Sequence, residues 1–505
     1  MLRRNGCNDK INNKDWHGKR AEIKEKAMSK KCMTSTAIAI FVAGTGISAQ
    51  TVLPAPKLVV NIAIDQLRTD YLEQLEPLYG NYGLKRLLRD GLFCTNAVYP
   101  FSPVDCASAL AAINTATTPN YNGITAEKWY SRTTGNVASC VDDQSFKGVQ
   151  TKDNSSAENI LTTTLSDELK VSTYGLAQIY SIAESREAAI IPAGHNANGT
   201  FWASASANSW CTSTYYSKDL PKWLDSYNKS NKPYSKSISL NEQITELALK
   251  CISANSLGKD DITDILFLTY DASSPVGKDG KDEYKETYIK IDNSLERLFT
   301  SLQTSVGLDN ILFVVTGTGY VEQQNVKPKN LRIPGGTFYI NRSANLLNMY
   351  LGALYGSDKY IEDTYNNQIF FNDKTLDKKR LNKTEVAEIA KQFLRESQGV
   401  ANAFSASELM SAYTPEMEKK RRGYRYSSCG DIMIEVSPGW NIVNEDTHQQ
   451  LKQNNYFIQT PIIFYGKSIK GKKLTTPVSI LSVSPTIAKT INIRAPNACS
   501  EEALF

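Results

Sequence analysis

The sequence predicts an α/β protein with a doubly wound, mostly parallel central sheet and helices on both faces. Two observations support this prediction: short apolar runs recur along the chain, and helical patterns lie between several of them. Runs that are apolar on both faces are typical of strands covered on both sides. Six such runs are present: Lys57–Asp65, Ala177–Ile182, Asp264–Asp271, Ile311–Thr316, Asp431–Val436 and Pro461–Tyr465. Strands that alternate with helices favour parallel pairing.

The helical patterns are clearest after the third strand. There, one apolar face repeats at helical spacing through Tyr284, Tyr288, Ile291, Leu295, Leu298 and Leu302. Similar patterns cover Leu240–Ile252 and Thr384–Leu394. Two stretches, about 196–260 and 321–430, are largely polar, aromatic and weakly periodic. They are predicted to be insertions that form a cap over the sheet, rather than separate domains.

The charge of the chain is concentrated near its N-terminus. The formal net charge is +5, but residues 1–49 contain ten Lys or Arg and four Asp or Glu. The remainder holds 47 basic and 48 acidic residues and is therefore nearly neutral. A neutral body gives no electrostatic basis for binding nucleic acid.

The segment 28–49 has the layout of a secretory signal. A short basic start at Met28–Lys31 precedes a small-apolar run, and Ser48-Ala49-Gln50 offers a cleavage point. A buried N-terminal helix is the alternative, but Gly44 and Gly46 disfavour helix. We therefore expect residues 1–27 to be an upstream extension or a disordered tail. Residues 50–505 would then form one exported, periplasmic or otherwise secreted domain, with no later run of the about 20 apolar residues that span a membrane.

Cysteine and histidine are the residues that limit metal chemistry here. Beyond the leader, seven Cys contain no CxxC pair, which excludes zinc-ribbon and thioredoxin motifs, and their disulfide pairing stays open. Only His195 and His448 remain, so a site of three His ligands is excluded. GxxxxGK[ST], HExxH and GxSxG motifs are absent.

Several segments nevertheless resemble the alkaline phosphatase superfamily, in the same order over about residues 55–495. The closest similarity is to exported bacterial two-zinc phosphatases with a Thr nucleophile, which are related to nucleotide pyrophosphatase/phosphodiesterases. This resemblance implies an alkaline-phosphatase-like fold and chemistry in which two zinc ions act on a phosphate. The matching segments are Lys57–Leu72, Gly83–Asn96, Thr117–Gly123, Trp129–Asp142, Ile191–His195, Gly430–Trp440 and Pro461–Gly466.

The resemblance also implies where the catalytic groups should lie, and most of them are replaced. Asp65 keeps the position of the first metal-ligating Asp. Cys106 takes the place of the nucleophilic Thr, and Glu127 that of an Asn that contacts phosphate. The phosphate-binding Lys and Arg correspond to Ser185 and Glu187.

The remaining zinc ligands are replaced as well. The Asp and His four residues apart correspond to Ser274 and Lys278, and the Asp-His pair after the next strand corresponds to Thr318 and Gly319. His448 matches the last zinc-binding His only with a two-residue insertion, and His195 belongs to a motif outside the metal shell. We therefore expect no bound cofactor.

These replacements favour a non-catalytic protein of the cell envelope that binds or scaffolds. Its partner would be another envelope protein or a glycan. Aromatic residues of the first insertion suit stacking on sugars or packing on a protein, although covering the sheet would explain them equally well. These residues are Trp202, Trp210, Tyr215, Tyr216, Trp223, Tyr227 and Tyr234.

The alternative is an active phosphomonoesterase, phosphodiesterase or sulfatase-like hydrolase that uses Cys106 and Asp65. A thiolate nucleophile would need a pKa lowered by a cation or a helix N-terminus. This sequence lacks the Arg of the formylglycine motif of sulfatases, because residue 110 is Leu. With zinc lost, we expect Asp65, Cys106, Thr318 and the loop 274–278 to meet at the sheet edge, with an Asp65–Lys278 ion pair.

Overall fold

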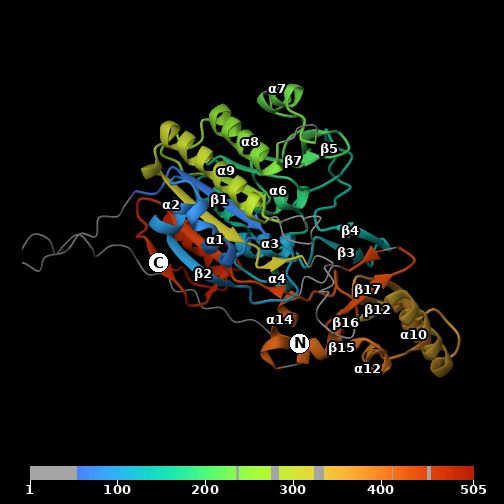
Figure 1. The fold of residues 1–505 in the computed structure, drawn as a ribbon. Coiled ribbons are helices and arrows are strands. Elements are labelled where there is room, and N and C mark those ends of the chain that lie inside the picture. The colour runs from blue at the N-terminus through green and yellow to red at the C-terminus, as the bar shows by residue number, and fades with distance from the viewer. Residues whose placement is uncertain are drawn as a thin grey trace, which may run out of the picture. The chain divides into compact units, whose positions relative to one another are not determined.

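The computed structural model describes residues 54–505, except 235–237, 274–283, 323–334, 412, 448 and 452–455. An eleven-stranded mixed sheet forms its centre, in the order β21-β2-β20-β10-β1-β9-β6-β7-β8-β5, with β22 also paired to β2 (Figure 1). The strands are β1 (Leu58–Asp65), β2 (Leu92–Val98), β5 (Gly148–Val149), β6 (Ile179–Ala183), β7 (Gly199–Ser204), β8 (Ser209–Ser213), β9 (Asp264–Asp271), β10 (Ile311–Gly317), β20 (Thr460–Tyr465), β21 (Lys472–Leu474) and β22 (Val478–Ser479).

The parallel part of this sheet is its middle. β1 pairs parallel with β9 and β10, and β6 pairs parallel with β9 and β7. β20 runs antiparallel to β10 and β2, and β8 runs antiparallel to β7 and β5. The α/β prediction is therefore confirmed, with antiparallel strands flanking a parallel centre.

Helices cover both faces of the sheet, because its strands are apolar on both faces. Val60 and Ile62 of β1 belong to one buried cluster with the apolar faces of α8 and α9. Val59 belongs to the opposite cluster, with residues of α3, α5 and α15. The helices around the sheet are α1 (Thr69–Leu75), α2 (Leu84–Asp90), α3 (Cys106–Thr115), α4 (Pro119–Asn122), α5 (Leu165–Ser172), α6 (Arg186–Ala193), α7 (Lys222–Ser230), α8 (Leu240–Asn255), α9 (Tyr284–Ser305) and α15 (Val483–Thr490).

The segment 196–260 extends the sheet, which differs from the cap insertion expected there. It supplies β7 and β8 to the main sheet, and α8 packs against β6 and β9. Trp202 and Trp210 are 2 % and 0 % exposed, so their rings fill the core and are not available to a partner. Of the aromatic residues in this segment, Tyr234 is the one that stays well exposed.

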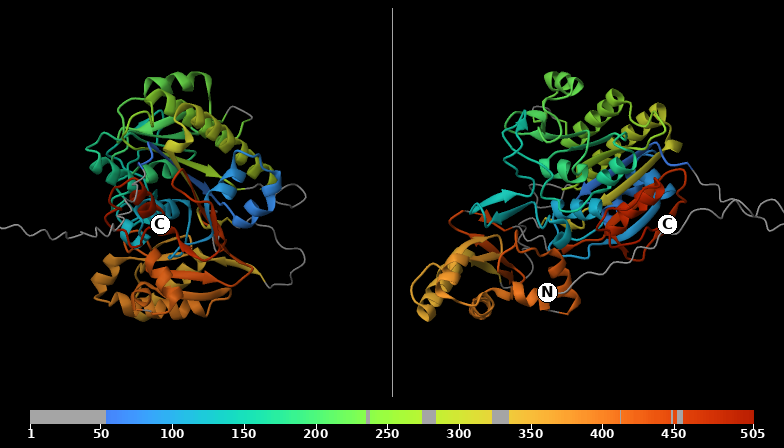
Figure 2. Two further views of the ribbon diagram at one scale, coloured as in Figure 1. Left: turned by 90° about the vertical axis from the view of Figure 1, so that its left-hand side faces the viewer. Right: turned by 180° about the vertical axis from the view of Figure 1, so that it is seen from behind.

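Residues 335–451 form a small subdomain with a hydrophobic core of its own (orange in Figure 2). Asp431–Val436, predicted to belong to the central sheet, lies here as β16 in a four-stranded sheet β13-β14-β16-β15. Burial alternates along β16, as in a strand covered on one face. The elements are β12 (Gly336–Tyr339), α10 (Ile340–Tyr355), β13 (Ile361–Tyr365), β14 (Gln368–Phe371), α11 (Asp373–Lys379), α12 (Lys383–Arg395), β15 (Val400–Ser405), α13 (Ala406–Ser411), α14 (Pro415–Gly423), β16 (Ile432–Val436), β17 (Trp440–Asn444) and β18 (Gln449–Gln450).

Two short pairs of strands complete the described structure. The hairpin of β3 (Lys128–Ser131) and β4 (Asn136–Ser139) follows the segment after α4. β11 (Tyr320–Val321) pairs with β19 (Tyr456–Phe457) just after the end of β10. Among the helices of the described residues, none is long and apolar enough to cross a membrane.

Candidate functional site

A cavity of about 640 Å³ lies at the carboxyl ends of β1, β6 and β9, where parallel sheets place their sites. We call it the central cavity. Asp65, Cys106, Glu127 and Ser185, all expected from the sequence, line it. Its other lining residues are Gln66, Glu184, Ala188, Asn241, Thr269, Tyr270, Asp271, Ser273, Tyr320 and Glu322.

The carboxyl group of Asp65 is held by hydroxyl groups. Thr318 Oγ1 donates to Oδ1 at 2.7 Å, and the Tyr320 hydroxyl donates to Oδ2 at 3.0 Å. Burial, and next the nearby charge of Asp271, raise the pKa of Asp65 to about 7, while these hydrogen bonds oppose the rise. The predicted meeting of Asp65 and Thr318 is confirmed. The predicted partner Lys278 lies outside the described residues, as do Ser274 and His448.

Thr318 is fixed by a second hydrogen bond. The backbone N–H of Gln66 donates to Thr318 Oγ1 at 2.9 Å, so the hydroxyl proton is directed to Asp65. The next residue, Gly319, has φ +78°, and a Cβ there would lie 2.3 Å from the ring of Tyr99. A His at 319, which the resemblance would require for zinc, has no room beside Tyr99 in this packing.

Cys106 is the first residue of α3, but the N-terminus of this helix already has an anion. The Asp105 carboxylate accepts hydrogen bonds from the backbone N–H of Ser108 at 2.8 Å and of Glu127 at 2.6 Å. Burial, and then the charges of Asp65, Asp105 and Glu127, hold the pKa of Cys106 well above its usual value. Cys106 is therefore a neutral thiol beside Asp65, and the thiolate that the hydrolase hypothesis needs is disfavoured.

Ser185 and Glu187 have structural roles in α6. Ser185 caps the helix, since its Oγ accepts the N–H of Ala188 at 3.1 Å. Glu187 accepts hydrogen bonds from Ser139 at 2.5 Å and from Arg186 at 3.1 Å, and does not line the central cavity. Glu187 therefore lies outside the cavity, held by Arg186 and Ser139, although the resemblance assigns a phosphate-binding residue to its position.

The acidic residues that do line the cavity were only partly expected. Glu184 and Asp271 follow or end β6 and β9, so the rule that sites lie at strand ends could have identified both. Burial and the charge of Asp271 raise the pKa of Glu184. Burial, and then the charges of Glu187 and Asp105, raise the pKa of Glu127 as well. Five acidic residues and no Lys or Arg line the described cavity, and their charge would repel a phosphate dianion. They are Asp65, Glu127, Glu184, Asp271 and Glu322.

The described residues do not fit the family's two-zinc site. Within them, no group of three or more His, Cys, Asp or Glu is placed to hold a metal ion. Both oxygens of Asp65 accept hydrogen bonds from hydroxyls. Zinc sites require three or four protein ligands of the His, Cys and carboxylate types. We therefore derive no catalytic step through zinc.

His195 is structural, as expected. Its Nδ1 lies 2.9 Å from Asp167 Oδ2, and its Nε2 lies 3.0 Å from the carbonyl oxygen of Ile160. Both neighbours are acceptors, so both ring nitrogens carry protons and neither has a lone pair for a metal. The hydrogen bond to Asp167 raises the pKa of His195, in agreement with an imidazolium.

The mixed sheet and the position of the cavity define an alkaline phosphatase superfamily fold. The sequence model of the type I phosphodiesterase / nucleotide pyrophosphatase family matches residues 59–461. The chain belongs to this family.

Relatives of known activity and structure agree. Alkaline phosphatase PafA of Elizabethkingia meningoseptica is 26 % identical over 88 % of this chain and 93 % of its own. Alkaline phosphatase PhoV of Synechococcus elongatus is 26 % identical over 88 % and 91 %. The crystal structure of wild-type PafA superposes with a TM-score of 0.79 at 25 % identity, over 90 % of this chain and 99 % of that one. Murine ectonucleotide pyrophosphatase/phosphodiesterase 5 shares the fold, at 13 % identity over 86 % of this chain and 95 % of that one, with a TM-score of 0.52.

Proposed function

We propose that this chain is a non-catalytic member of its family that acts by binding or scaffolding in the cell envelope. One observation carries the proposal. The hydroxyls of Thr318 and Tyr320 donate hydrogen bonds to both carboxyl oxygens of Asp65, where the resemblance implies a zinc ion. Neutral hydroxyl donors therefore satisfy the hydrogen-bonding capacity of this buried carboxyl without a metal ion. Export follows from the signal-like segment 28–49, which lies outside the described residues.

The charge around Asp65 supports the same proposal. A phosphate ester entering the central cavity would meet Glu127, Glu184 and Asp271 and no described Lys or Arg. The helix N-terminus that would attract an anion is neutralised by Asp105. Ground-state binding and transition-state stabilisation of a phosphate would both be weak.

Metal analysis and a hydrolysis assay on the secreted protein test this proposal together. We expect no stoichiometric zinc after dialysis, no change of melting temperature with a chelator, and no hydrolysis of p-nitrophenyl phosphate or its diester above that of the Asp65→Asn variant. Two retained zinc ions, or activity that Asp65→Asn removes, would show a working enzyme.

The hydrolase alternative rests on one geometric fact, that Cys106 and Asp65 line the same cavity. In that reaction Asp65 would have to accept the thiol proton, because the pKa of Cys106 is far above neutral pH. A Cys106→Ser comparison separates the two functions. Equal background rates for the original chain and Cys106→Ser support the non-catalytic proposal, whereas loss of a measurable rate supports the alternative.

A further inference from the structure

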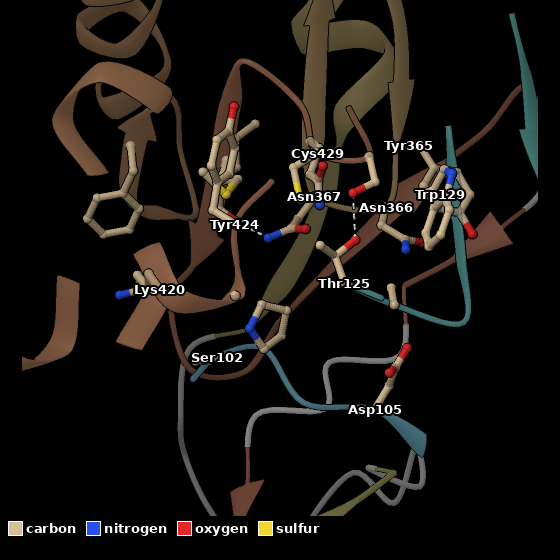
Figure 3. Close-up of a pocket in the computed structure, with 18 of the residues that line it drawn as sticks. Ser102, Asp105, Thr125, Trp129, Tyr365, Asn366, Asn367, Lys420, Tyr424 and Cys429 are labelled. Carbon is tan, nitrogen blue, oxygen red and sulfur yellow. Dashed lines mark hydrogen bonds between the residues drawn. The ribbon is translucent and has the colours of Figure 1, made fainter. Parts of the chain in front are cut away.

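The small subdomain has an inner side that contacts the main unit, the part of the fold that holds the central sheet. There the Thr125 hydroxyl of the main unit donates a hydrogen bond to Ser428 Oγ of the subdomain at 2.9 Å, and residues of both parts line one cavity (Figure 3). α10 lies at the opposite, outer end of the subdomain (Figures 1 and 2). This helix therefore presents a side that faces away from the rest of the fold.

α10 is apolar on two sides. Its inner side buries Ile340, Ala344, Leu347 and Leu351 in the core of the subdomain. A second side carries five apolar residues at the helical spacing i, i+3, i+4, i+7 and i+8, and all five are exposed. We call them the outer stripe, and they are Leu346, Met349, Tyr350, Ala353 and Leu354. A helix that is apolar all round is normally buried all round, so the outer stripe calls for a partner.

The outer stripe is large for an apolar surface in contact with water. Leu346 is 57 % exposed, Met349 70 % and Leu354 50 %. The ring of Tyr350 stacks on Phe393 of α12, with 5.1 Å between ring centroids, which extends the surface onto a second helix. Together the exposed side chains offer roughly 400 Å², and contiguous apolar patches of this size mark interaction sites.

The residues of the stripe are arranged so that it fits a second copy of itself. We consider two α10 helices that pack antiparallel about a two-fold axis at Tyr350. Leu346 then lies opposite Leu354 of the second copy, because each is four residues from the axis. Arg342 lies opposite Asp358 of the second copy, because each is eight residues from it. Apolar residues therefore meet apolar residues, and a base meets an acid.

Charge also selects the direction of packing. α10 contains a single charged residue, Arg342, which forms a surface ion pair with Glu445. Asp358, just beyond the end of the helix, lies 3.2 Å from Lys378 at the surface. Parallel packing would place Arg342 beside Arg342 of the second copy, whereas antiparallel packing places it beside Asp358. Charges at the rim of a contact set its register and exclude wrong arrangements, so the antiparallel arrangement is favoured.

We propose that this chain forms a two-fold symmetric dimer in which the outer stripes of two copies pack antiparallel on each other. Burial of both stripes removes roughly 800 Å² of apolar surface from water, and the rim around them brings the contact toward the about 1,200–2,000 Å² of specific interfaces. This inference goes beyond the proposed function, because it requires neither catalysis in the central cavity nor its loss.

Sedimentation velocity on the full secreted chain, between about 1 and 100 µM, tests the dimer. We expect a monomer–dimer equilibrium within this range. Met349→Glu puts one carboxylate from each copy into the apolar contact, so the affinity should fall about tenfold or more. Because Met349 is 70 % exposed, the melting temperature of the diluted monomer should not change. Met410→Glu is the matched control, because Met410 lies on α13, is 56 % exposed and is outside the stripe.

Cross-linking with a short bismaleimide tests the register, in a chain that lacks its two half-exposed thiols through Cys106→Ser and Cys499→Ser. Tyr350→Cys should cross-link to its own copy, because it lies at the two-fold axis. Leu346→Cys alone should not, because its two copies lie about 12 Å apart along the helix axis, but it should cross-link when mixed with Leu354→Cys.

Three results would overturn the proposal. The first is a chain that stays monomeric up to about 100 µM, including one whose stripe binds phosphatidylcholine vesicles instead. The second is a dimer that Met349→Glu leaves intact, which would place the contact elsewhere. The third is a dimer in which Leu346→Cys cross-links to its own copy and Tyr350→Cys does not, which would exclude the antiparallel register.

Discussion

Two carboxyl groups beside strand ends, Asp65 and Asp431, are compensated in opposite ways. Asp65, at the end of β1, accepts hydrogen bonds from two neutral hydroxyls, and its pKa is raised to about 7. Asp431, just before β16, is 2 % exposed and lies 3.1 Å from Arg132 and 2.8 Å from Lys383. One environment tolerates a neutral acid, and the other is built for a charged one.

The two carboxyl groups differ in their partners because only Asp431 links two parts of the fold. Arg132 extends from the β3–β4 hairpin of the main unit to Asp431 of the small subdomain, where its guanidinium also stacks on Phe370 and Tyr426. It donates as well to the carbonyl oxygens of Tyr426 and Cys429. Here ion pairs hold two parts of the fold together. At Asp65 no cation lies beside the carboxyl among the described residues, and two hydroxyls donate hydrogen bonds to it instead.

The largest expected effect comes from removing Arg132. Arg132→Met leaves the buried Asp431 with one cation, Lys383, and the backbone N–H of Phe371, so we expect the free energy of unfolding to fall by about 3–5 kcal/mol. Urea denaturation measures this change. Arg297→Met is the control, because its pair with Glu246 is more exposed than that of Arg132 with Asp431 and should contribute under about 1 kcal/mol. Equal losses in both variants would contradict the special role of the buried cluster.

A smaller effect is expected at the neutral site. Thr318→Val leaves Asp65 Oδ1 and the N–H of Gln66 without the shared hydroxyl, which should lower the free energy of unfolding by about 1–3 kcal/mol. Thr304→Val, on the exposed side of α9, makes the same chemical change and should cost at most about 0.5 kcal/mol. A Thr318→Val protein as stable as the control would show that the hydroxyl does not compensate Asp65.

The third test extends the comparison to His195, an ion pair with a titratable cation. Its pKa is raised in the folded protein, so its contribution is fully present below about pH 6.5, its unfolded value, and is lost as pH rises through the folded value. His195→Gln should therefore cost about 1–2 kcal/mol at pH 6 and less at pH 9, measured by urea denaturation.

The partner Asp167 stays ionised over this pH range, because the hydrogen bond to His195 and others lower its pKa despite burial. Glu158 is the other nearby acid that favours the charged imidazole. A cost of His195→Gln that does not vary between pH 6 and pH 9 would mean that His195 is neutral in the folded protein.

The sequence predicted the central strands well, because a strand buried on both faces leaves a local apolar run. Five of the six predicted runs lie in the central sheet. Asp431–Val436 does not, since its alternating burial belongs to a strand covered on one face and the apolar residues alone do not say which sheet covers it. The segment 196–260 was misjudged for a related reason: polar residues between Trp202 and Trp210 form the turn of a hairpin whose rings are buried.

The sequence predicted which residues lie near the candidate site better than it predicted which groups their side chains contact. Asp65, Cys106 and Ser185 line the central cavity because each stands beside a strand end or a helix start. The direction of a side chain is not a local property. Glu187 turns to Arg186 and Ser139, whereas Glu184, three residues earlier, faces the cavity.

By itself, then, the sequence determined the α/β class and the scarcity of histidine, because these depend on residue type and local pattern. The tertiary structure alone decided how Asp65 is compensated. Its partner Thr318 is 253 residues away along the chain. The two meet because β1 and β10 pair in a register that sets Ile64 beside Gly317, and the next residues are Asp65 and Thr318. A slip of one residue would turn these side chains to opposite faces, and only the packed sheet fixes that register.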